Sequence, residues 1–115
     1  MTRPRLNAAV EATAIVRKIS AQGDFATVLR QGDSERGSLL LVVTCRGRHV
    51  TCLNRQLDLS SGSYRWNRLG PSESASSAEI RDFLGSQARL DPDLWLIELD
   101  IASPERFIAE TTASG

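Results

Sequence analysis

The sequence is poor in the residues that build metal and redox centres. Its 115 residues include one histidine, His49, and two cysteines, Cys45 and Cys52. The cysteines do not follow a metal-ligand spacing, and a single histidine cannot complete a zinc site of the usual kind. Both cysteines are interpreted as small apolar side chains in adjacent strands. The cysteines and the histidine therefore indicate no zinc centre, and we expect no cofactor.

The sequence also lacks a long apolar segment. Its longest apolar run, Leu39–Val43, is far shorter than the roughly 20 residues that a membrane-spanning helix needs. Residues 1–6 contain basic side chains but lead into no apolar segment, which is not typical of a secretory signal. We therefore expect a cytoplasmic protein with no membrane partner.

The net charge is zero, but the charges are unevenly distributed along the chain. Residues 1–68 carry eleven basic and five acidic side chains, whereas residues 69–115 carry three basic and nine acidic ones. In so small a chain, two complementary halves of one fold explain this split better than a basic surface for a partner. The length predicts a single domain over residues 1–115, with frayed tails at 1–6 and 111–115.

Two main helices are predicted from their end signals. Asn7 is a plausible N-cap for the first, and Gly23 is its stop, although β-branched residues leave a strand over Ala9–Ala14 as an alternative. Ser76-Ser77-Ala78-Glu79 matches a capping box for the second helix, which Asp91-Pro92 ends. A short third helix is predicted to open at Ser103-Pro104.

Alternating apolar residues and turn signals predict five strands. They are Phe25–Arg30, Leu39–Arg46, His49–Leu57, Ser63–Leu69 and Leu94–Ile101. The order predicts an α+β fold with a mostly antiparallel sheet. We expect the first four strands to form a meander and the two main helices to pack on one face of the sheet.

The second and third strands are predicted to form a hairpin. A type II′ turn at Gly47-Arg48 would place Cys45 and Cys52 on the same face of the sheet. They would extend an apolar stripe made of Leu39, Leu41, Val43 and Val50. Because side chains alternate along a strand, His49 and Cys52 would lie on opposite faces, which argues against a thiol nucleophile with His49 as its base.

Four parts of the chain together carry a recognisable pattern. They are the run Ala14–Lys18, the loop Arg30-Gln31-Gly32-Asp33 with Gly37, the residue Trp66, and the block Asp91–Leu99. This pattern resembles the bacterial domain-of-unknown-function family 1491, typical of alphaproteobacteria, over about Ala14 to Asp100. The part Asp91-Pro92-Asp93-Leu94-Trp95 is the most specific. The resemblance implies a shared fold but no mechanism, and Gln31 stands where a second arginine is common in the family.

Three groups of residues are candidate sites. The carboxylates of Asp91, Asp93, Glu98 and Asp100 form an acidic cluster in the sequence, and such oxygens bind Mg²⁺ or Ca²⁺. Aromatic side chains flanked by arginine stack on single-stranded nucleic acid, and the residues of this type are Tyr64, Trp66, Arg68, Arg46 and Arg48. A glycine-bracketed loop binds anions through backbone N–H groups, and Arg30, Gly32, Asp33 and Gly37 form such a loop.

Each group also has a plainer structural explanation. The carboxylates are also explained as residues at a helix end and on a strand. Trp66 is explained as a core residue, and the glycine loop as a connection between two strands. We therefore favour a non-enzymatic binding module whose partner is another protein or a second copy of the chain. A nucleic-acid-binding module and a metal-dependent enzyme remain the alternatives.

Overall fold

The structure, a computed structural model, describes residues 7–113, which form three helices and five strands. The elements are α1 (Ala8–Ala21), β1 (Phe25–Arg30), β2 (Leu39–Cys45), β3 (Arg48–Asp58), β4 (Ser63–Leu69), α2 (Ser77–Leu90), β5 (Trp95–Asp100) and α3 (Pro104–Ala113). This confirms the predicted α+β fold and the predicted order of elements. Helix α3 runs to Ala113, into the segment expected to fray, while residues 1–6 and 114–115 lie outside the described part.

The sheet has the strand order β1-β5-β2-β3-β4. The expected meander is therefore wrong at its first step, because β5 is inserted between β1 and β2 and pairs in parallel with β2. Strand β5 is buried on both faces at Leu96 and Ile97, whereas β1 is mostly exposed. A strand that is apolar on both faces is stabilised most at a covered position inside the sheet, which leaves the edge to β1.

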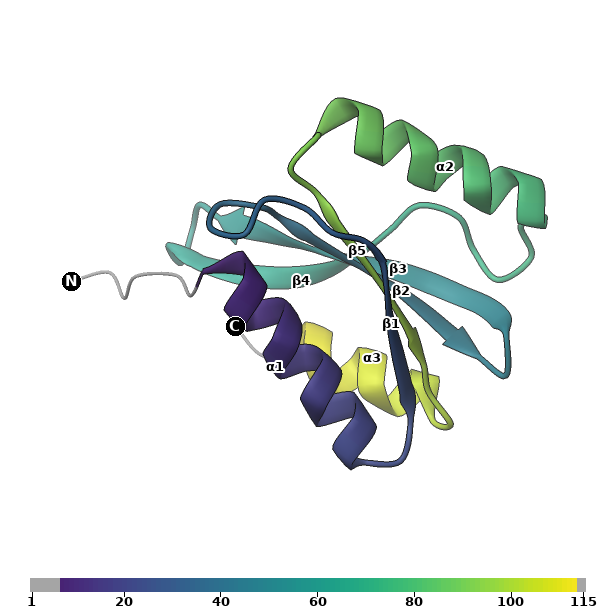
Figure 1. Cartoon of the computed structure of the whole chain (residues 1–115). Coiled ribbons are helices and arrows are strands. Elements are labelled where there is room, and N and C mark those ends of the chain that lie inside the picture. Colours follow the sequence, from purple (N-terminus) through teal and green to yellow (C-terminus); the bar gives the residue numbers. More distant parts are fainter. Residues whose placement is uncertain (1–6, 114–115) are drawn as a thin grey trace.

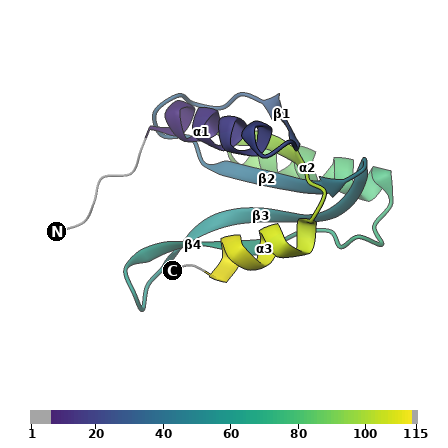
Figure 2. The same cartoon turned by 90° about the horizontal axis from the view of Figure 1, so that it is seen from below.

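The helices cover both faces of the sheet, so the expectation that α1 and α2 share one face is also wrong (Figures 1 and 2). Helices α1 and α3 pack on the face that carries Leu39, Leu41 and Val43, here called the α1 face. Helix α2 packs on the opposite face, here called the α2 face, against Leu40 and Val42. Consecutive apolar residues in β2 point to alternate faces, so both faces need a cover.

The helix ends follow the predicted signals. The Asn7 side chain accepts a hydrogen bond from the N–H of Val10, and α1 is helical from Ala8, so the alternative strand over Ala9–Ala14 is wrong. In α2 the Ser76 side chain accepts from the N–H of Glu79, while the Glu79 side chain accepts from the N–H of Ser76. This reciprocal pair is the predicted capping box.

The β2–β3 hairpin turns one residue earlier than predicted. Its turn residues are Arg46 and Gly47, with φ of 53° and 78°, and positive φ at both positions defines a type I′ turn. The strand pairing then shifts between Val43 and Thr44, so that Thr44 faces His49 while Val42 faces Cys52. The extra residue in β3 is a β-bulge.

The bulge corrects two predictions about side-chain orientation. Cys52 packs with Leu40 and Val42 on the α2 face, so it does not extend the stripe of Leu39, Leu41 and Val43. His49 lies on the same face as Cys52, because their pairing partners Thr44 and Val42 are two residues apart in β2.

Within residues 7–113, no helix is both long and apolar enough to cross a bilayer.

Candidate functional site

The predicted anion-binding loop contacts the block Asp91–Trp95. At the end of β1, the Arg30 guanidinium donates to the carbonyl oxygen of Leu94 at 2.5 Å and to that of Pro92 at 2.9 Å. The N–H of Asp33 donates to the Asp93 carbonyl at 3.0 Å, and the Trp95 indole N–H donates to the Asp33 carbonyl at 2.8 Å. The loop therefore holds the entry to β5 in place.

Gly32 and Gly37 belong to the same arrangement. A Cβ atom on Gly32 would lie 2.7 Å from the indole Cδ1 of Trp95, and one on Gly37 would lie 2.8 Å from it. Both atoms would also overlap the carbonyl oxygen of Asp93. The four predicted loop residues thus lie together, but their contacts are with the protein itself, which favours a structural role over anion binding.

The Asp33 side chain stabilises the loop from within. Its carboxylate accepts hydrogen bonds from the N–H groups of Glu35 and Arg36, at 3.1 and 2.7 Å. These bonds favour the charged form and lower the pKa of Asp33 below its ordinary value. The N–H of Gly37 donates to the Asp33 carbonyl. The loop is thus a hydrogen-bonded turn built on Asp33.

The four candidate carboxylates do not form one cluster. The Asp91 side chain accepts from the N–H of Asp93 ahead of β5, whereas the Asp100 carboxylate, at the far end of β5, accepts from the N–H groups of Arg46 and Gly47. Glu98 lies between them on the α2 face. Among residues 7–113 no group of three His, Cys, Asp or Glu side chains is arranged to hold a metal ion.

The candidate nucleic-acid residues are divided between two places. The guanidinium of Arg55 lies 5.2 Å from the ring centroid of Trp66 and 5.8 Å from that of Tyr64, and Trp66 packs on the core of the α1 face. Arg68 forms an ion pair with Glu105 of α3. Arg46 and Arg48, by contrast, lie at the β2–β3 turn. The aromatic rings therefore already stack against the protein's own arginine.

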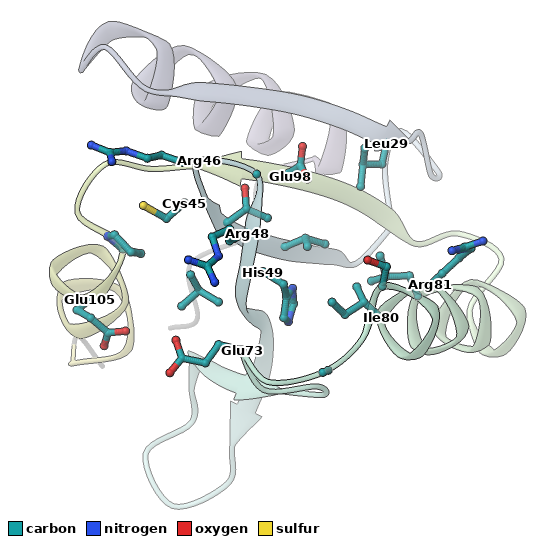
Figure 3. A pocket seen from close by; sticks show the side chains of 18 of the residues that line it. Leu29, Cys45, Arg46, Arg48, His49, Glu73, Ile80, Arg81, Glu98 and Glu105 are labelled. Carbon is teal, nitrogen blue, oxygen red and sulfur yellow. The ribbon is translucent and has the colours of Figure 1, made fainter.

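A groove of about 1000 Å³ lies over the α2 face (Figure 3). Strands β1, β5, β2 and β3 contribute Leu29, Glu98, Val42, Thr44 and His49 to its floor, and helix α2 contributes one wall. Arginine and glutamate side chains line the mouth, namely Arg46, Arg48, Arg81, Glu73 and Glu105. The groove therefore combines an apolar floor with charged sides.

Two buried polar atoms without a hydrogen-bond partner line this groove. They are Oγ1 of Thr44, whose residue is only 4% exposed, and Nδ1 of His49, which faces Thr44 across the strand pair. A third such atom, Oδ1 of Asn54, lies outside the groove. Buried polar atoms normally have partners, so two exceptions on paired residues distinguish this part of the groove from the rest of the sheet.

Sequence reasoning missed this pair because it depends on the position of the β2–β3 turn, which lies one residue earlier than expected. With the expected turn at Gly47-Arg48, Thr44 would pair with Thr51, whereas the observed turn at Arg46–Gly47 pairs it with His49. The sequence offered one weak indication of this pair. His49 is the single histidine of the chain and it lies two residues after a turn glycine. Thr44 gave no signal, because threonine is an ordinary strand residue.

The missing hydrogen bond of Thr44 predicts an unusual response to mutation. We expect Thr44→Val to raise the free energy of unfolding by about 1 kcal/mol, because the methyl group removes a buried hydroxyl that has no partner. Thr51→Val is the matched control, since Thr51 is 5% exposed but its hydroxyl donates to the Cys52 carbonyl. Urea unfolding should show no gain for Thr51→Val. A loss of stability in Thr44→Val would show that its hydroxyl has a partner.

The Cys52 thiol predicts a pH dependence of stability. Burial raises its pKa to about 12 from an ordinary value of 9.0. Above pH 9 the unfolded chain therefore loses this proton while the folded chain keeps it, so the free energy of unfolding should fall as the pH rises from about 9 to 12. The slope approaches about 1.4 kcal/mol per pH unit. Urea unfolding of Cys52→Ala should lack this contribution, and equal slopes in the two proteins would contradict the assignment.

These features define a small α+β domain with a five-stranded mixed sheet, helices on both faces and a groove beneath α2. The sequence profile described as "Protein of unknown function (DUF1491)" matches residues 6–109, so the chain belongs to this family. A comparison with curated proteins finds no match.

Solved structures of a DUF1491 family protein and of a second protein share this fold. The crystal structure of a DUF1491 family protein from Caulobacter crescentus CB15 has a TM-score of 0.75 and 24% identity, over 85% of this chain and 90% of that chain. The solution structure of protein Atu0922 from A. tumefaciens has a TM-score of 0.69 and 23% identity, over 85% of this chain and 87% of that chain. The family and fold are therefore those that the sequence pattern implied.

Proposed function

We propose that this chain is a non-enzymatic binding module that takes an extended polypeptide segment of another protein into the groove over the α2 face. The observation that carries the proposal is the adjacent pair of buried, unpartnered atoms, Thr44 Oγ1 and His49 Nδ1. Such atoms cost stability unless a ligand satisfies them. Natural proteins retain destabilising features of this kind mainly at functional sites.

The dimensions of the groove support a chain-like ligand. Its floor crosses the four adjacent strands β1, β5, β2 and β3, and three inter-strand spacings amount to about 14 Å. An extended peptide covers that distance with about four residues. Apolar side chains along the groove, from Leu29 and Val42 to Ile80 and Leu84, offer contacts for its side chains.

The chemistry of the site supports binding over thiol catalysis. Cys52 is fully buried and does not line the groove, and burial raises its pKa so that the unreactive thiol form persists. His49 and Cys52 share a face, so it is burial rather than orientation that argues against a thiol nucleophile. Both cysteines are free, which supports the proposal that the protein works in a reducing compartment such as the cytoplasm.

A random heptapeptide library displayed on phage tests the proposal. We expect peptide families that bind the wild type and lose binding to Ser77→Trp, which places an indole at the groove wall. Ala78→Trp is the matched control, because Ala78 is the next residue of α2, is exposed and does not line the groove. If no family is enriched, or if Ser77→Trp binds every family as the wild type does, the proposal is wrong. Light scattering of the free protein shows whether a second copy is the occupant instead.

A further inference from the structure

We propose that the floor of the groove selects a peptide with a positively charged N–H donor, an arginine or lysine side chain that points down between His49, Thr44 and Glu98. This inference rests on the proposed function and names the feature of the peptide that the site recognises. It follows from the hydrogen-bonding capacity of the three floor side chains.

The tautomer of His49 is set by its neighbour in the β4–α2 loop. Its Nε2 atom lies 3.0 Å from the carbonyl oxygen of Pro71. A carbonyl oxygen can only accept, so Nε2 carries the hydrogen in the neutral ring, and Nδ1 is left as an acceptor. This acceptor is buried and has no partner among the described residues. We infer that a hydrogen-bond donor of the bound peptide satisfies this acceptor.

Thr44 and Glu98 extend the set of acceptors across two neighbouring strands. Thr44 Oγ1 has two lone pairs and no partner, and the Glu98 carboxylate is half-buried, with no hydrogen bond or ion pair to any described residue. Glu98 pairs with Val42, two residues from Thr44 on the same face. All three residues line the groove, and Figure 3 shows His49 and Glu98 among its side chains.

A cationic N–H donor complements this set best. A guanidinium group has five N–H donors and an ammonium group has three, and neither accepts. Either one can donate to the neutral acceptors and is attracted by the charge of Glu98. A carboxylate or phosphate group would instead meet the like charge of Glu98 and the acceptor Nδ1 of His49, with the Thr44 hydroxyl as its one donor.

The rim of the groove shapes the rest of the peptide. Arg48 and Arg81 are exposed at the mouth and form no ion pair with any described residue. They would repel a peptide that is basic throughout and attract acidic residues on either side of the inserted side chain. We therefore expect a single basic residue with acidic neighbours.

Parallel selections from the heptapeptide phage library test this inference. Peptides enriched on the wild type should carry arginine or lysine at one fixed position, and this preference should disappear on Glu98→Gln. Asp82→Asn is the control, because it removes an exposed charge from α2 outside the groove. Enriched families without a fixed basic residue, or with one that Glu98→Gln leaves unchanged, would overturn the inference while the binding function stands. If no family is enriched, the proposed function fails as well.

Synthetic versions of the most enriched heptapeptide give the size of the effect. Replacing its fixed basic residue with norleucine should weaken binding at least about tenfold in fluorescence polarisation, since a buried hydrogen bond to a charged group is lost. Exchanging arginine and lysine shows which of the two donors the site prefers. Because His49 is the single histidine, the ring nitrogen signals in NMR spectra are unambiguous, and Nδ1 should shift with the basic peptide. An unshifted Nδ1 signal would contradict its role.

Discussion

Gly32→Ala is expected to lower the free energy of unfolding by about 3 kcal/mol or more. The added Cβ would lie 2.7 Å from both the carbonyl carbon of Leu94 and the indole of Trp95. Main-chain atoms cannot move aside as the end of a flexible side chain can, so the loop and the block Asp91–Trp95 would have to separate. Urea unfolding followed by circular dichroism measures the change.

Gly85→Ala is the matched control for this variant. Gly85 lies inside α2, and its added Cβ would meet only the end of the Arg89 side chain at 3.4 Å. Alanine in a helix interior should therefore raise the free energy of unfolding by about 0.5–1 kcal/mol. A Gly32→Ala protein as stable as the wild type would show that the loop does not hold the block.

The contact between the loop and the block explains why these residues belong to the family pattern. The loop at Arg30–Gly37 and the block Asp91–Trp95 are separate motifs in the sequence, but in the structure one holds the other. The most specific residues of the pattern are thereby explained by architecture. The groove, which carries the proposed function, lies elsewhere, over the α2 face.

Arg55→Ala is expected to lower the free energy of unfolding by about 3 kcal/mol. Arg55 donates to both carboxylate oxygens of Glu11 at 2.5 and 2.8 Å, and the two side chains are 18% and 10% exposed. The guanidinium also stacks on Trp66 and Tyr64. Its loss would leave the Glu11 carboxylate buried without its guanidinium partner. Thermal and urea unfolding measure the change.

Two further variants separate the ion pair from general effects of charge. Arg68→Ala should cost no more than about 1 kcal/mol, because Arg68 and Glu105 are 54% and 76% exposed. The double variant Glu11→Met with Arg55→Met should recover part of the loss, since it removes both buried charges. Equal losses for Arg55→Ala and Arg68→Ala would contradict the importance assigned to burial.

The sequence predicted the local features of the fold well. The alternation Trp95, Ile97 and Leu99 identified both the last strand and its core-facing side, and Ser76–Glu79 identified the start of α2. These signals act between residues that are neighbours in the chain. Local patterns therefore carried enough information for helices, strands and caps.

The long-range arrangement was not predictable in the same way. The insertion of β5 between β1 and β2 depends on which strands are covered on both faces, and this emerges only when all elements pack together. The turn at Arg46–Gly47 differs from the expected one by a single residue, because an arginine adopts a positive φ there. That shift of the turn places Thr44 opposite His49. A candidate site that depends on the exact position of a turn cannot be found from the periodicity of apolar residues.

The central claim is that Thr44 and His49 leave hydrogen bonds unmade in the free protein because a ligand makes them. Calorimetric titration of Thr44→Val with the heptapeptide most enriched on the wild type tests this claim most directly. We predict affinity reduced at least about tenfold in a protein at least as stable as the wild type, and unchanged affinity in Thr51→Val. Wild-type affinity in Thr44→Val would contradict the claim.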